Sequence, residues 1–234
     1  MRSEMEEVLR IAIIGDFNFA YNSHNATNQA LQHVQDVLDQ PLNYYWLNEK
    51  ECCEEIQTFY SDYDAVIIAP GPYRQPFYFN SIINTLLDND VPVLGTGDCF
   101  KILVEQFFAQ KGFDLGREKI ISDNLIDGNQ FTGINLEKLS DEFSKIYLNK
   151  SKVEYSSSRF SILPQYSEIL AEDFEIGARN QYFDPEILKS KRHQFFVFTM
   201  FCPQVLSTSD MPHPIFTYFI KNARRIRDIK AEAS

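Results

Sequence analysis

The chain has 234 residues, 44% of them hydrophobic and 14% aromatic, so it is long enough to bury the core of one α/β domain or of two small ones. Its formal net charge is -11 and its pI is about 4.8. Nucleic-acid backbones and anionic membranes both select clustered Lys and Arg, so we expect neither of them as a partner.

The N-terminal sequence MRSEMEEVLR is acidic and does not resemble a signal peptide. The longest apolar run, FFVFTMF, has the length of a strand and not of a membrane span. Two of the four cysteines, Cys52 and Cys53, are adjacent and therefore poorly placed for a relaxed disulfide. These features predict a cytoplasmic protein with reduced thiols.

The first half of the chain alternates strands with helices. Apolar, β-branched runs such as LRIAIIG and DAVIIAPG predict buried strands. The predicted strands cover residues 9–15, 43–47, 64–71 and 91–97. The predicted helices cover residues 26–38, 49–60, 77–88 and 98–110, the second of them with Asn48 as N-cap. Repeated strand–helix units imply a parallel sheet with helices on both faces.

The second half predicts shorter elements. Short strands are expected at residues 119–122, 160–163, 168–172 and 181–183, and one helix at 137–148. A strand at 194–201 and a helix at 214–227 close the chain. Together these elements predict a doubly wound, mostly parallel α/β sheet with a small β-rich insertion. We expect a single domain over residues 1–234.

In open sheets of this kind, ligands bind beyond the carboxyl ends of the strands. Four turns are therefore candidate parts of a site, at residues 16–25, 70–74, 95–99 and 202–204.

Five stretches of the chain, in this order, match one family. LRIAIIGDF resembles an opening strand, DAVIIAPGP an oxyanion strand, and VPVLGTGDCFKILVEQFFAQ a nucleophile strand and helix. HQFFVFTMFCPQVLS resembles a closing strand and MPHPIFTYFIKNA a final helix. The chain thus resembles a class I glutamine amidotransferase and, within that group, the glutaminase domain of CTP synthase. Its GDF, PYR and GTxxxF motifs further resemble stand-alone proteins related to the CTP synthase C-terminal region.

The resemblance implies a flavodoxin-like fold and a Cys-His-Glu triad, in which a thiolate attacks the glutamine amide. The family elbow reads Gly-x-Cys-x-Gly, so Gly97 matches the cysteine and Cys99 the last glycine. The family's closing His-Pro-Glu becomes Cys202-Pro203-Gln204, with Cys202 on the histidine and Gln204 on the glutamate. All three triad-equivalent positions are replaced, which predicts that the chain is not a glutaminase.

The positions expected to form the oxyanion hole match the family better than the triad positions do. Gly71 matches the family glycine whose backbone N–H would hold the developing negative charge. The helix N-terminus near Asp98 would offer further N–H groups. The Asp98 carboxylate, however, would compete for those donors and repel an oxyanion. This is a second argument against acyl transfer.

Cys99 is an alternative nucleophile. It is predicted in the first turn of a helix, where the macrodipole lowers a thiol pKa, and His24 is the histidine best placed to act as its base. Cys99 and Cys202 are also candidates for a redox pair or for soft-metal ligands. The interpretation we favour is a packing role for both thiols, with no metal and no cofactor.

Ligand binding is the remaining hypothesis. Arg74 carries a planar guanidinium suited to a carboxylate, and Tyr73 and the His24 loop flank the same crevice. We therefore favour a protein that binds a small polar or carboxylate ligand or a partner protein. The alternatives are an enzyme that uses Cys99, and an amidotransferase subunit that supplies ammonia to a synthetase-like partner. The chain contains no phosphate-binding GxxxxGK loop for such a synthetase reaction.

Overall fold

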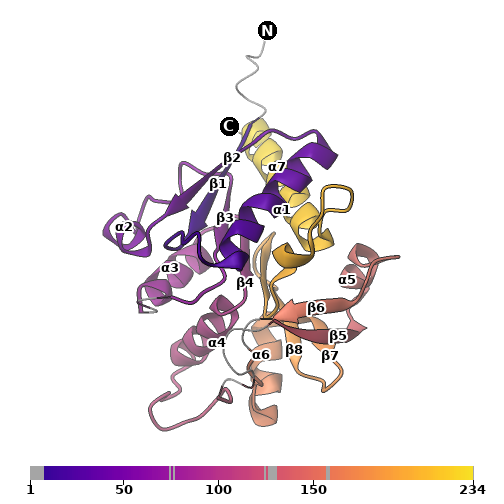
Figure 1. Cartoon of the computed structure of the whole chain (residues 1–234). Coiled ribbons are helices and arrows are strands. Elements are labelled where there is room, and N and C mark those ends of the chain that lie inside the picture. Colours follow the sequence, from indigo (N-terminus) through magenta and orange to yellow (C-terminus); the bar gives the residue numbers. More distant parts are fainter. Residues whose placement is uncertain are drawn as a thin grey trace.

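The computed structural model describes residues 8–73, 75, 77–123, 125, 131–156 and 159–233. Its strands are β1 (Leu9–Ile14), β2 (Leu42–Leu47), β3 (Ala65–Ile68), β4 (Val93–Thr96), β5 (Thr132–Leu139), β6 (Val153–Ser156), β7 (Phe174–Asn180), β8 (Pro185–Ser190) and β9 (Phe196–Thr199). They form one sheet in the order β2-β1-β3-β4-β9-β8-β7-β5-β6 (Figure 1). The sheet is parallel from β2 to β9 and antiparallel from β9 to β6.

Helices cover both faces of this sheet. One face carries α1 (Asn22–Leu38), α5 (Asp141–Ile146) and α7 (Pro214–Ala233). The other face carries α2 (Glu49–Glu54), α3 (Phe77–Asp88), α4 (Cys99–Gln110) and α6 (Ser167–Asp173). Each face has its own apolar core, because alternate residues of the central strands point to opposite sides. The predicted α/β fold, with an insertion before the last strand, is therefore confirmed.

The first half follows the prediction closely, since long apolar runs and local capping specify it. The helix predicted at residues 77–88 is α3, with the same bounds. Asn48 caps α2 as expected, because its side-chain oxygen accepts hydrogen bonds from the backbone N–H groups of Lys50 and Glu51. The helix predicted over residues 49–60 is too long, because α2 ends at Glu54 and turns follow it.

Three predictions in the insertion are wrong. The strand expected at residues 168–172 is helix α6. The strand expected at 181–183 is the turn between β7 and β8, where the Asn180 side-chain oxygen accepts from the backbone N–H groups of Tyr182 and Asp184. The helix expected at 137–148 begins as β5, which pairs with β7, and only its later part is helical, in α5.

The strands expected at residues 119–122 and 160–163 reduce to one antiparallel bridge, between Ile121 and Ile162. The sequence analysis missed β6, β7 and β8, which form antiparallel pairs with one another's neighbours in the insertion and with β9. In the part of the chain that the structure describes, no helix is both long enough and apolar enough to cross a membrane.

Candidate functional site

The turn between β4 and α4 is a sharp strand–turn–helix elbow centred on Gly97. Gly97 has φ +69°, a left-handed conformation that glycine adopts without steric cost. Its backbone N–H donates to the Thr199 carbonyl at 2.9 Å. A Cβ atom at this position would lie 3.3 Å from Cys202 Sγ and 3.1 Å from Pro70 Cβ. The Cβ of a side chain at position 97 would therefore contact both Pro70 and Cys202.

Cys202 and Gln204 follow β9, where the 3-10 helix η3 (Pro203–Leu206) begins. Both side chains are buried, with exposed fractions of 0% and 2%. Gln204 Nε2 donates to Thr96 Oγ1 at 3.2 Å, next to the elbow. Gln204 Oε1 has no hydrogen-bond partner among the described residues. The fold thus brings Gly97, Cys202 and Gln204 together, although their correspondence to a triad stays a prediction.

Asp98 packs against Gly71, the residue predicted to match the oxyanion glycine. A Cβ at Gly71 would lie 2.9 Å from Asp98 Cβ, and closer still to the carboxylate. Burial raises the pKa of Asp98, and the nearby Lys101 ammonium opposes that shift. The Asp98 side chain makes no capping hydrogen bond to α4. Its carboxylate therefore crowds Gly71 without satisfying the N–H groups at the start of the helix.

Cys99 faces the core and not the crevice. Its thiol is fully buried and donates to the Thr96 carbonyl at 3.2 Å. Burial raises the pKa of Cys99 well above its ordinary value, and the adjacent Tyr73 hydroxyl opposes the shift. The expected lowering of the Cys99 pKa by the helix macrodipole is therefore wrong, because desolvation dominates. All four cysteines lie in the described part of the chain, and no disulfide joins Cys99 to Cys202.

We expect alkylation by iodoacetamide at pH 8 to follow thiol burial. Cys53 is half-buried, whereas Cys99 and Cys202 are fully buried. Because only an accessible thiolate reacts, the native protein should lose its Cys53 thiol at least about tenfold faster than its Cys99 thiol. Peptide mass spectrometry over a time course measures both rates, and a urea-unfolded sample should show them converge. Preferential native labelling of Cys99 would revive its role as a nucleophile.

A cavity, here called the β1 pocket, opens beside the elbow at Gly97. It has a volume of about 290 Å³ and is lined by Gly15, Asp16, Phe17, Asn18, Tyr21, His24, Glu49, Ala69, Pro72 and Tyr73. The turn after β3 connects it to the elbow, because Pro70 lies where a Cβ at Gly97 would reach it, while Pro72 and Tyr73 line the pocket. Two of the predicted ligand-binding residues, His24 and Tyr73, thus meet in one cavity.

His24 is held by the pocket wall. Its ring stacks on Trp46 with centroids 4.9 Å apart, and its Nδ1 accepts from the Asn18 backbone N–H at 3.2 Å. Burial lowers the pKa of His24, and the carbonyl groups of Pro70 and Gly71 oppose that shift. The imidazole is consequently neutral at pH 7, with its proton on Nε2.

Tyr73 closes the pocket on the other side. Its hydroxyl donates to the Ala69 carbonyl, and its ring packs on Phe79 with centroids 4.1 Å apart. Burial raises the pKa of Tyr73 well above the ordinary value, so it stays protonated. Arg74, the third predicted ligand-binding residue, lies outside the described residues.

The sequence analysis missed Glu49 as a pocket residue. Glu49 follows β2, which runs parallel to β1, so the carboxyl end of β2 reaches the same edge of the sheet. Only four such turns were selected from the sequence, and the turn after β2 was not among them. Applying the rule to every parallel strand would have found it. Among the described residues, no group of three or more His, Cys, Asp or Glu side chains could hold a metal ion.

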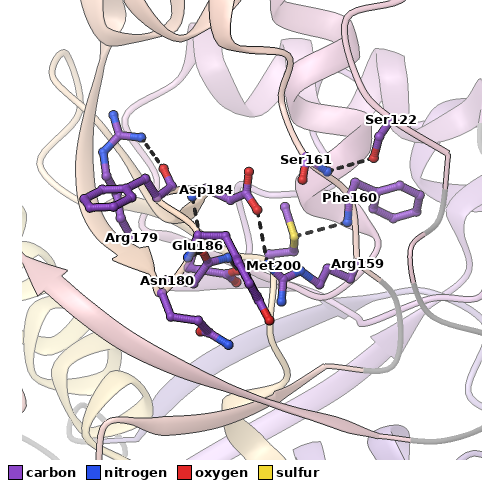
Figure 2. Close-up of polar contacts among 12 residues, drawn as sticks. Ser122, Arg159, Phe160, Ser161, Arg179, Asn180, Asp184, Glu186 and Met200 are labelled. Carbon is purple, nitrogen blue, oxygen red and sulfur yellow. Dashed lines mark hydrogen bonds and ion pairs between the residues drawn. The ribbon is translucent and has the colours of Figure 1, made fainter.

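A buried polar cluster lies in the insertion, next to the end of β9 (Figure 2). Glu186 is fully buried, and its Oε1 accepts from Asn180 Nδ2 at 2.5 Å. Arg159 forms an ion pair with Asp184 at 3.1 Å. The Met200 backbone N–H donates to the Glu186 carbonyl and joins the cluster to the strand that precedes Cys202. Burial raises the pKa of Glu186 to about 7.

Comparisons with known proteins agree with this fold. No protein-family model matches the chain. It is 23% identical to the CTP synthase of Onion yellows phytoplasma (strain OY-M) over 93% of its length, and 23% identical to that of Archaeoglobus fulgidus over 97%. These matches cover 44% and 48% of the two relatives, so the chain spans about half of their length.

Solved structures also share this fold. The Trypanosoma brucei CTP synthase glutaminase domain with bound acivicin superimposes with a TM-score of 0.77 at 20% identity, over 93% of this chain and 94% of that one. A proposed GMP synthase subunit from Thermoplasma acidophilum gives a TM-score of 0.62 at 13% identity, over 95% of this chain and 98% of that one.

Proposed function

We propose that this chain, a class I glutamine amidotransferase-like domain, binds a small polar ligand in the β1 pocket and does not hydrolyse glutamine. The observation that carries the proposal is the elbow. A Cβ at position 97 would contact Cys202, and glycine there supplies no nucleophile. Cys202 is a poor general base near neutral pH, and Gln204 has no charge with which to stabilise an imidazolium.

The β1 pocket supports the binding half of the proposal. It combines a buried neutral imidazole, a protonated phenol and two carboxylate side chains around a cavity of about 290 Å³. A cavity of this size with a few converging polar groups is typical of small-molecule sites. Neither Cys99 nor Cys202 lines it.

An enzyme that uses Cys99 has less support. Cys99 has no exposed surface, and burial raises its thiol pKa. The hydrogen bond of the thiol goes to the Thr96 carbonyl, and the Nδ1 hydrogen bond of His24 goes to Asn18. The cysteine and its predicted base are therefore each engaged with other groups.

Ammonia release from glutamine tests the catalytic half. We expect the purified protein to release no ammonia above a heat-denatured control. A Gly97→Cys, Cys202→His, Gln204→Glu variant, with Asp98→Ala added in a second version to clear the space beside Gly71, should release ammonia above that background. Ammonia formed by the natural protein, and lost with Cys99→Ala, would overturn the proposal.

A further inference from the structure

We propose that Ser190 is a nucleophile activated by His193, and that the cavity beside the two residues accepts a small uncharged carboxylic ester. The inference goes beyond the proposed function and does not depend on it. Ser190 ends β8, which runs antiparallel to β9, so it lies beside the amino end of β9. The elbow and the β1 pocket lie at the opposite edge of the sheet, beyond the carboxyl ends of the parallel strands.

The hydrogen-bonded pair is the first observation. Ser190 Oγ lies 2.7 Å from His193 Nδ1, and His193 Nε2 lies 2.7 Å from the Leu87 carbonyl oxygen. A carbonyl oxygen can only accept, so Nε2 carries the proton of the neutral ring and Nδ1 accepts from the Ser190 hydroxyl. The Arg192 backbone N–H donates to Ser190 Oγ at 3.2 Å and holds that oxygen in place. A hydroxyl that donates to an imidazole oriented by a third group is the arrangement of an activated serine.

The second observation is a cavity of about 260 Å³ that both residues line. Leu87, Phe107 and Phe174 give this cavity apolar walls. Ser190 is 5% exposed and pairs with Phe174 across β7 and β8, so its hydroxyl lies among these walls. A small, partly apolar cavity around a hydroxyl suits the acyl group of a short ester.

The charged residues of the cavity are the third observation. Two cations and two carboxylates line it, so its charges balance and an uncharged substrate suits it; they are Lys111, Arg192, Asp88 and Asp173. The Lys111 ammonium contacts Glu172 Oε2 at 3.0 Å and Asp173 Oδ2 at 2.9 Å. An ammonium group has three N–H donors, so one of them remains for the carbonyl oxygen of an ester, whose negative charge grows during attack.

The reaction is an acyl transfer with water as the final acceptor. Ser190 Oγ bonds to the ester carbonyl carbon while its proton moves to His193 Nδ1. The bond from that carbon to the alcohol oxygen then breaks, and the imidazolium returns the proton to the leaving alcohol. A water molecule repeats the two steps on the acyl-serine, which releases the acid and restores the hydroxyl.

Diisopropyl fluorophosphate tests the nucleophile in the natural protein, because an activated serine oxygen displaces its fluoride. Peptide mass spectrometry over a time course should show Ser190 modified at least about tenfold faster than Ser207. Ser207 is the internal control. Its Oγ lies 3.1 Å from His33 Nδ1, but His33 makes no second side-chain hydrogen bond to a described residue, and Ser207 is the more exposed serine. Modification of Ser190 no faster than that of Ser207 would overturn the proposal.

Hydrolysis of 4-nitrophenyl acetate tests turnover. The natural protein should hydrolyse this ester at least about tenfold faster than the Ser190→Ala and His193→Gln variants, whereas Ser207→Ala should match the natural protein. Equal rates in the natural protein and Ser190→Ala would overturn the proposal. Circular dichroism checks that each variant folds, and the comparison of Ser190 with Ser207 needs no variant. Neither residue of the pair lines the β1 pocket, so failure here leaves the proposed function standing.

Discussion

Replacing Glu186 by glutamine should raise the free energy of unfolding at pH 8 by about 3 kcal/mol, and by less than about 1 kcal/mol at pH 5. Burial raises the pKa of Glu186 from 4.5 to about 7, so between these values the folded state holds a proton that the unfolded state has lost. Stability therefore falls as pH rises through this window, and the penalty is complete once Glu186 ionises in the folded state. Glutamine cannot ionise and has no such penalty.

The surroundings of Glu186 favour this substitution. Asn180 donates to Glu186 Oε1 and could donate to a glutamine oxygen in the same way, while Oε2 has no hydrogen-bond partner among the described residues. The Arg159 guanidinium lowers the Glu186 pKa, and the carboxylates of Asp184 and Glu154 raise it. Removal of the buried charge therefore leaves the hydrogen bond in place and relieves the repulsion.

Urea unfolding at pH 5 and pH 8 measures the effect. The exposed Glu168 provides the control, because Glu168→Gln should change stability equally at both pH values. A Glu186→Gln variant that gains the same stability at pH 5 as at pH 8 would contradict a raised pKa. A variant destabilised at pH 8 would show that the Glu186 charge is needed for the cluster.

Gly95→Ala should destabilise the fold by about 3 kcal/mol, which corresponds to a fall in Tm of roughly 6–12 °C. Gly95 lies on β4 directly opposite Phe198 on β9. A Cβ at Gly95 would lie 2.5 Å from two Phe198 ring carbons and 2.8 Å from Cys99 Sγ. Both neighbours are buried, so neither can move without disturbing the core.

A double-mutant cycle tests the cause of this loss. Phe198→Leu removes the ring, so the Gly95→Ala, Phe198→Leu variant should be more stable than the sum of the two single changes predicts, by at least about 1 kcal/mol. Gly133→Ala is the control within a strand, because its Cβ would meet nothing closer than 3.7 Å and should be nearly neutral. Additive effects would mean that the Phe198 ring is not the obstacle.

The sequence predicts the parallel half of the sheet well, for a physical reason. Segments such as Ala65–Ile68 and Phe77–Asp88 carry their own signal, as a buried apolar run or an amphipathic helix. The insertion carries no comparable local signal. Leu139 is a strand residue because it pairs with Ala178, and residues 181–183 form a turn because the Asn180 side chain accepts hydrogen bonds from backbone N–H groups that follow it. The strand pairing joins residues far apart in the sequence and is not visible in a short window, whereas the turn has a local signal in Asn180 that the sequence analysis missed.

The candidate site likewise has features that the sequence predicts and features that it does not. The proximity of Gly97 and Cys202 could be predicted, because both follow parallel strands that end at one edge of the sheet. The direction of the Cys99 side chain could not, because it depends on the gap beside Gly95 that the thiol fills. Glu49 could also have been predicted, because it follows β2, a parallel strand that ends at the same edge of the sheet.

The left-handed backbone at Gly97 has a consequence for how this elbow can change over generations. Any residue other than glycine would be strained there and would press on Pro70 and Cys202, at a cost of about 1–2 kcal/mol. On the proposed register, a single change to cysteine would bring that cost without activity, because residues 202 and 204 would still lack the acid–base pair. Such an intermediate would lose stability and gain no activity, so selection would not favour it. Glycine at position 97 therefore makes a stepwise return to a catalytic triad unfavourable, because the first step lowers stability and gives no activity.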